Sequence, residues 1–139
     1  MINLSTYLLL DGSCKEAMLF YQSCLGGELS LSLVGDTPMK AMFPPEMHGR
    51  VINAHLKADG ISLSASDWML QGDRPVSGNT ICLFAGGGTS EETLSLFNKL
   101  SDGATVTDPL SKQPFGLYGA LNDKFGIRWM FHSDNDNGG

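Results

Sequence analysis

The chain has 139 residues, of which 42% are hydrophobic and 17% are charged, so it can form a core and is not a disordered chain. Its formal net charge of −6 argues against a nucleic-acid partner, which would need a basic face. The first residues do not have the form of a secretion signal, and no apolar run approaches the length of a membrane span. We therefore expect a cytoplasmic protein with neither nucleic acid nor a membrane as its partner.

The first half of the chain predicts a strand, a helix and three further strands. The predicted strands are residues 4–10, 28–34, 51–57 and 61–65. Ser13 and Glu16 have the spacing of a capping box at the start of the helix, and Gly26 has the character of a residue that ends it. The proline-rich segment 35–50 is predicted to be irregular, either as a lid or partner contact or as a cover over its own core.

The second half repeats this order of elements. Its predicted strands are residues 79–85, 104–107, 117–121 and 127–132, with a loop at 108–114. Thr89 and Glu92 form a second capping box, and Gly103 ends the second helix. The expected organisation is a first module at 1–66, a linker at 67–78, a second module at 79–132 and a disordered tail at 133–139, which together make one domain.

The three cysteines, Cys14, Cys24 and Cys82, are odd in number and lack the spacing of a metal site. Cys14 and Cys24 lie at the two ends of the first predicted helix, roughly 15 Å apart at a rise of about 1.5 Å per residue. That separation is too large for a disulfide within one chain. We therefore expect buried thiols in a reducing compartment.

Three stretches of this sequence resemble a known family. They are residues 16–21 with 25–28, residues 55–67, and residues 115–119 with 123–130. In these stretches the chain resembles the vicinal oxygen chelate superfamily, which contains glyoxalase I, bleomycin-resistance proteins and extradiol dioxygenases. More narrowly it is similar to the PhnB-like branch, which also carries the label 3-demethylubiquinone methyltransferase-like. No glycine-rich cofactor loop follows the first predicted strand, so the sequence itself gives little support to a methyltransferase.

The resemblance implies an α+β fold in which two βαβββ modules form an open, curved mixed sheet around a cavity, and it implies a homodimer. Catalytic members of the superfamily hold a divalent metal with four His or Glu side chains, one from each of four strands, and the metal acts as a Lewis acid. The corresponding positions here are Thr6, His55, Thr80 and Met130, of which His55 alone is a usual ligand for such a site.

From this resemblance we expect a metal-independent protein that has no cofactor and binds a small organic molecule, with an aromatic one favoured. The alternative is a lyase, isomerase or dioxygenase that depends on a divalent metal and uses a non-standard ligand set including His55. The sequence assigns no catalytic residue.

Strand alternation and the resemblance together select the residues expected to line the cavity. They are Thr6, Leu8, Asn53, His55, Thr80, Tyr118, Arg128 and Met130. Structural roles remain as alternatives: His55 bonded to its neighbours, Arg128 exposed near a strand end, and Tyr118 packed in the core or at a dimer seam. Phe115 and Trp68 are further aromatic candidates for lining a cavity or stacking on a planar ligand.

Overall fold

The structure is a computed structural model that describes residues 1–134. The chain divides into two compact units, Met1–Val76 (unit 1) and the part from Ser77 onwards (unit 2). This division falls within the segment 67–78 that the sequence predicts to be a linker. Neither helix of the described residues is long and apolar enough to cross a membrane.

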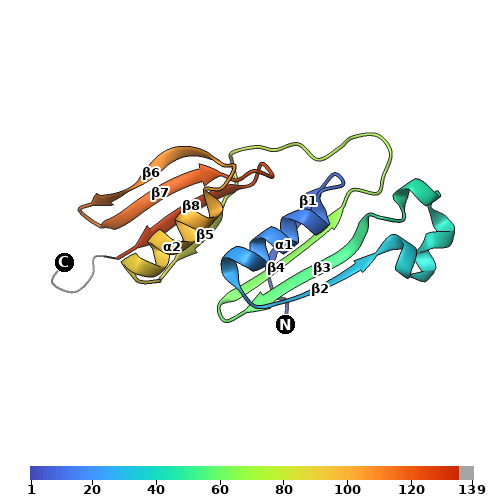
Figure 1. The fold of residues 1–139 in the computed structure, drawn as a ribbon, viewed down its shortest axis with the longest axis horizontal. Helices are drawn as coiled ribbons and strands as arrows, with labels where there is room; N and C mark the ends of the chain where they lie inside the picture. Colours follow the sequence, from blue (N-terminus) through green and yellow to red (C-terminus); the bar gives the residue numbers. More distant parts are fainter. Residues whose placement is uncertain (135–139) are drawn as a thin grey trace. The chain divides into compact units, whose positions relative to one another are not determined.

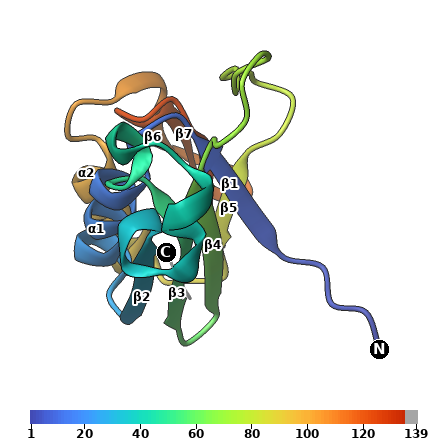
Figure 2. The same cartoon turned by 90° about the vertical axis from the view of Figure 1, so that its right-hand side faces the viewer.

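Unit 1 is a four-stranded sheet with a helix on one face. Its elements are β1 (Thr6–Leu10), α1 (Cys14–Leu25), β2 (Glu28–Leu33), β3 (Val51–Ala58) and β4 (Ile61–Asp67), shown in Figure 1. The strand order is β1-β4-β3-β2, and the β1–β4 pair is parallel while the other pairs are antiparallel. The helix α1 lies on one side of the strands, as Figure 2 shows. It buries Met18 and Tyr21, and the sheet buries Ala54 and Leu56.

Unit 2 has the same element order and the same strand order. Its elements are β5 (Leu83–Gly86), α2 (Ser90–Leu100), β6 (Thr105–Gln113), β7 (Gly116–Asn122) and β8 (Arg128–Ser133). The sheet order is β5-β8-β7-β6, with β5 and β8 parallel. Phe97 of α2 packs edge-on against the buried Phe131 of β8, with ring centroids 5.0 Å apart. The predicted α+β fold of two βαβββ modules with open sheets is therefore confirmed.

The two helices start in different ways. In α2 the capping box is present: the Thr89 Oγ1 accepts from the Glu92 amide at 3.0 Å, and Glu92 Oε1 accepts from the Thr89 amide at 3.0 Å. The capping box predicted at Ser13 is wrong, because the Ser13 side chain makes no capping hydrogen bond. The buried carboxylate of Asp67 takes its place, since its Oδ1 accepts from the amides of Gly12 at 2.8 Å and Cys14 at 3.0 Å.

Some predicted boundaries are also wrong. The sequence predicts a loop at 108–114, but β6 continues to Gln113 because register shifts on either side of Asp108 accommodate Pro109 in an edge strand. β5 begins at Leu83 rather than at residue 79. β8 includes the buried Ser133, which was assigned to the tail. The rest of the predicted disordered tail, residues 135–139, lies outside the described residues.

The segment 35–50 is not wholly irregular. It forms much of three short 3₁₀ helices, η1 (Val34–Asp36), η2 (Pro38–Met42) and η3 (Pro45–Met47). Proline occupies the start of the last two, where its missing N–H is not needed by the helix.

Candidate functional site

Each sheet has one face turned away from its helix, which we call the open face. Residues that pair across neighbouring strands share a face, so the strand register identifies the side chains there. In unit 1 the register aligns Tyr7, Ser64, His55 and Ser30 in a row across β1, β4, β3 and β2. His55 Nδ1 lies 2.8 Å from Ser64 Oγ. This row offers hydroxyl and imidazole groups for hydrogen bonding.

The predicted residues of unit 1 fall on both faces of the sheet. Asn53 and His55 lie on the open face, as alternation in β3 predicts. Thr6 and Leu8 lie instead on the face covered by α1, because they pair with Leu63 and Ala65, which are both buried. This corrects their expected position facing a cavity. Their neighbour Tyr7, with 49% of its surface exposed, lies on the open face in their place.

The open face of unit 2 carries a group of four rings, from Phe84, Phe115, Tyr118 and His132, which we call the aromatic cluster. The His132 ring lies 6.5 Å from Phe84 and 5.6 Å from Phe115 between ring centroids, with interplanar angles of 25° and 31°. Phe115 also meets Tyr118 at 6.4 Å in an edge-on arrangement. Phe84 and Phe115 are 61% and 55% exposed. The predicted Met130 lies on the same face and pairs with Phe84.

The other two predicted residues of unit 2 have different surroundings. The guanidinium of Arg128 donates from Nη1 to Thr107 Oγ1 at 3.1 Å and to Asn122 Oδ1 at 3.4 Å, and its Nη2 lies 3.7 Å from Asp108 Oδ2. Its charge is therefore partly balanced within its own sheet. Thr80 is exposed and precedes β5, so it is not on a strand as the ligand assignment requires.

The side chains at the four matching positions do not fit the metal centre that the resemblance implies. Among residues 1–134, no three His, Cys, Asp or Glu side chains gather closely enough to hold a metal ion. The four matching positions carry Thr6, His55, Thr80 and Met130, and Thr80 lies outside the strands. His55 is therefore the one usual ligand among these four positions, and a single imidazole does not make the four-ligand centre.

Cys14 does not provide a reactive thiol in the core of unit 1. Cys14 is buried, and its pKa is raised to about 12, first by burial and then by the nearby Asp67 carboxylate. Its thiol is therefore protonated at neutral pH and is a poor nucleophile. Cys82 is only half-buried, in contrast to the prediction of three buried thiols.

Sequence reasoning did not select Tyr7, Ser64 or Phe84 as residues of the open faces. In β1 three consecutive leucines hide the alternation, and the face is settled only by pairing with β4. In unit 2 the alternation of β8 did place His132 on the face away from the helix. Its ring contacts with Phe84 and Phe115 depend on tertiary structure, and no sequence spacing indicates them.

Comparison with protein families gives a match over most of the chain. Residues 3–131 match the family described as 3-demethylubiquinone-9 3-methyltransferase. Protein YjdN of Escherichia coli K12 is 28% identical, in an alignment that covers 93% of this chain and 93% of YjdN.

Solved structures show the same fold. The protein PA1353 from Pseudomonas aeruginosa is 27% identical with a TM-score of 0.86, over 98% of this chain and all of that one. A Bacillus cereus PhnB protein, named as a putative 3-demethylubiquinone-9 3-methyltransferase, is 27% identical with a TM-score of 0.74, over 95% and 99% of the two chains. The fold is also shared by a glyoxalase/bleomycin resistance protein/dioxygenase family enzyme from Burkholderia phytofirmans. That enzyme is 16% identical with a TM-score of 0.59, over 94% of this chain and 98% of that one.

Proposed function

The chain belongs to the 3-demethylubiquinone-9 3-methyltransferase (PhnB-like) family, and from this premise we propose that it binds small planar aromatic molecules without a metal. The aromatic cluster on the open face of unit 2 is the observation that carries the proposal. A homodimer in the cytoplasm, expected from the sequence and the resemblance, is part of the same proposal.

The geometry of the aromatic cluster suits a flat ligand. The His132 ring is inclined by only 25° to Phe84 and by 31° to Phe115, so it lies closer to parallel than to perpendicular with each of them. More than half of the surface of each phenylalanine is exposed in the free chain. A planar molecule that covers these rings removes apolar surface from water, and each favourable ring pair adds roughly 0.5–1.5 kcal/mol beyond that burial.

The proposed independence from metal rests on the side chains present. Met130 adds a soft, flexible thioether beside Phe84, which suits apolar contact better than binding of a hard divalent cation. In unit 1, His55 is the one usual ligand among the four matching positions, since the others carry Thr6, Thr80 and Met130. One imidazole alone does not support a Lewis-acid centre.

A thermal-shift experiment tests the proposal. Protein treated with EDTA is mixed with acridine, phenazine and flavone, which are flat and apolar. A ligand at 100 times its Kd stabilises the native state by about 2.7 kcal/mol, which raises the Tm by several degrees. Phe115→Ala should remove this rise. Leu94→Ala, which truncates an exposed apolar side chain of α2 in the same unit, should retain it.

The proposal fails if none of the three compounds raises the Tm at high excess. It also fails if Phe115→Ala and Leu94→Ala retain the same rise, because the aromatic cluster is then not the binding surface. A rise that needs an added divalent metal would favour the metal-dependent alternative instead.

A further inference from the structure

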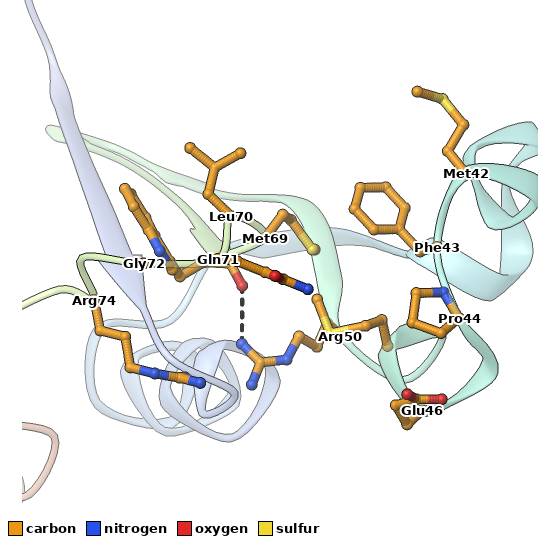
Figure 3. A pocket seen from close by; sticks show the side chains of 12 residues that line it. Met42, Phe43, Pro44, Glu46, Arg50, Met69, Leu70, Gln71, Gly72 and Arg74 are labelled. Carbon is orange, nitrogen blue, oxygen red and sulfur yellow. Dashed lines mark hydrogen bonds between the residues drawn. The ribbon is translucent and has the colours of Figure 1, made fainter.

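A separate pocket of about 630 Å³ lies within unit 1, between the end of the segment 35–50 and the chain that follows β4 (Figure 3). Its volume is in the range of roughly 300–1,000 Å³ that is usual for ligand pockets. The residues lining it are Met42, Phe43, Pro44, Glu46, Met47, Arg50, Trp68, Met69, Leu70, Gln71, Gly72 and Arg74. None of them belongs to the aromatic cluster.

One wall of the pocket is held by His48. Its Nε2 lies 3.0 Å from the carbonyl oxygens of both Lys40 and Phe43, and its own carbonyl accepts from the Gly35 amide at 3.0 Å. Gly35 packs so closely that an added Cβ would lie 3.0 Å from the His48 Cβ. These contacts fix the chain that presents Met42 and Phe43 to the pocket.

Two guanidinium groups share one carboxylate at the opposite side. Arg50 Nη1 donates to Asp11 Oδ1 and to the Trp68 carbonyl oxygen, both at 2.9 Å, and Arg74 Nη1 donates to Asp11 Oδ2 at 2.6 Å. The pKa of Asp11 is lowered, first by Arg50 and then by Arg74, so this carboxylate is ionised at neutral pH. The two guanidinium groups and the one carboxylate together carry a net charge of +1.

Figure 3 shows Arg74 and Glu46 at opposite sides of the pocket, with Arg50 between them. Arg74 is 67% exposed on its side chain, so much of its guanidinium is accessible to a ligand. A second acid group of a ligand would approach the carboxylate of Glu46 and be repelled. The charge pattern therefore favours a single negative charge on the ligand.

The remaining lining is mostly apolar and adaptable. Three methionines, Met42, Met47 and Met69, provide flexible thioether side chains, and Leu70 is 69% exposed. These groups suit a ligand with an apolar body.

We infer that this pocket binds a small organic monoanion with an apolar body, whose acid group lies at Arg50 and Arg74 and whose body contacts the methionines and Leu70. This site is distinct from the aromatic cluster, and it gives the segment 35–50 a role as one wall of a binding site.

The test uses two fluorescent probes that share one ring system. 1-Anilinonaphthalene-8-sulfonate is a monoanion, and N-phenyl-1-naphthylamine is uncharged. We expect Arg74→Gln to weaken binding of the anion about threefold to fivefold and to leave the neutral probe unchanged. Leu70→Asn should weaken both probes, by about fivefold, because apolar contact is lost.

Matched controls separate this site from other surfaces. Lys99→Gln removes one exposed positive charge from α2, and Ile81→Asn makes an exposed aliphatic side chain polar, both in unit 2. Neither should change the affinity of either probe by more than about 1.5-fold. Phe115→Ala, which tests the aromatic cluster, should leave the effect of Arg74→Gln intact, so the two sites can fail separately.

Three outcomes would overturn the inference. One is that the anionic probe does not bind at all, and another is that Arg74→Gln weakens the binding of both probes equally. The third is that Lys99→Gln weakens binding of the anionic probe as much as Arg74→Gln does. Both Arg74 and Leu70 are largely exposed, and a circular-dichroism spectrum identical to that of the unmodified protein shows that each variant is folded.

Discussion

Replacing Asp67 tests most sharply how unit 1 is held together. This buried side chain accepts from three backbone amides: those of Gly12 at 2.8 Å and Cys14 at 3.0 Å on Oδ1, and that of Val51 at 2.8 Å on Oδ2. It therefore joins the end of β4 to the start of α1 and the start of β3. Removing it leaves donors that water cannot readily reach.

Asp67→Asn and Asp67→Ala differ in how many of these hydrogen bonds they leave. In Asp67→Asn the side-chain oxygen can still accept hydrogen bonds from the Gly12 and Cys14 amides, but the side-chain NH₂ group then faces the Val51 amide. We therefore expect the free energy of unfolding to fall by roughly 2–3 kcal/mol. In Asp67→Ala both acceptor oxygens and all three hydrogen bonds are lost, and we expect a loss of roughly 4–5 kcal/mol. This is less than the sum for three hydrogen bonds to a charged group, because the site relaxes.

Urea denaturation followed by circular dichroism measures these losses as changes in the free energy of unfolding. Asp36→Asn is the control, because Asp36 is exposed and removal of a surface charge changes stability by less than about 0.5 kcal/mol. The reasoning is refuted if Asp67→Asn unfolds at the same urea concentration as Asp36→Asn.

Three further predictions concern unit 2 and the helix starts. Asp123→Asn should destabilise unit 2 by roughly 2–3 kcal/mol, because Asp123 accepts from the Trp129 indole at 2.9 Å and from two amides of its turn; a change below about 0.5 kcal/mol in urea denaturation would contradict this. Thr89→Ala should cost about 1 kcal/mol and Ser13→Ala much less, because only Thr89 caps its helix; equal losses in thermal unfolding would count against the assignment. The pKa of Glu92 is lowered, first by the hydrogen bond from the Thr89 backbone, so its contribution to stability is present above its ordinary pKa and is lost as pH falls through the lowered value. The Tm difference between the unmodified protein and Glu92→Ala should therefore shrink in acid, and a difference that is constant from neutral to strongly acidic pH would disprove it.

Local signals in the sequence predicted much of the fold. The Thr89–Glu92 capping box and the glycines that follow both helices identify helix ends through contacts within a few residues. Alternation in β3 and β8 gave the correct faces because each strand places large apolar residues, such as Leu56 and Phe131, on one side only. Such patterns are readable without knowledge of the partner strand.

The errors come from contacts between distant parts of the chain. The cap of α1 is Asp67, which lies more than fifty positions from the helix start and cannot be recognised from residues near Ser13. The faces of β1 depend on its parallel pairing with β4. The pocket of unit 1 depends on an ion pair between Asp11 and Arg74, and the aromatic cluster depends on contact between Phe84 and His132. These residues are far apart in the sequence, so neither site has a sequence motif.

The most direct test of the proposed function is isothermal titration calorimetry of the metal-stripped protein with the compound that gives the largest thermal shift. The proposal predicts the same affinity with and without EDTA, and loss of affinity in Phe115→Ala but not in Leu94→Ala. Binding that appears only after a divalent metal is added, or affinity that is unchanged in Phe115→Ala, would contradict metal-independent binding at the aromatic cluster.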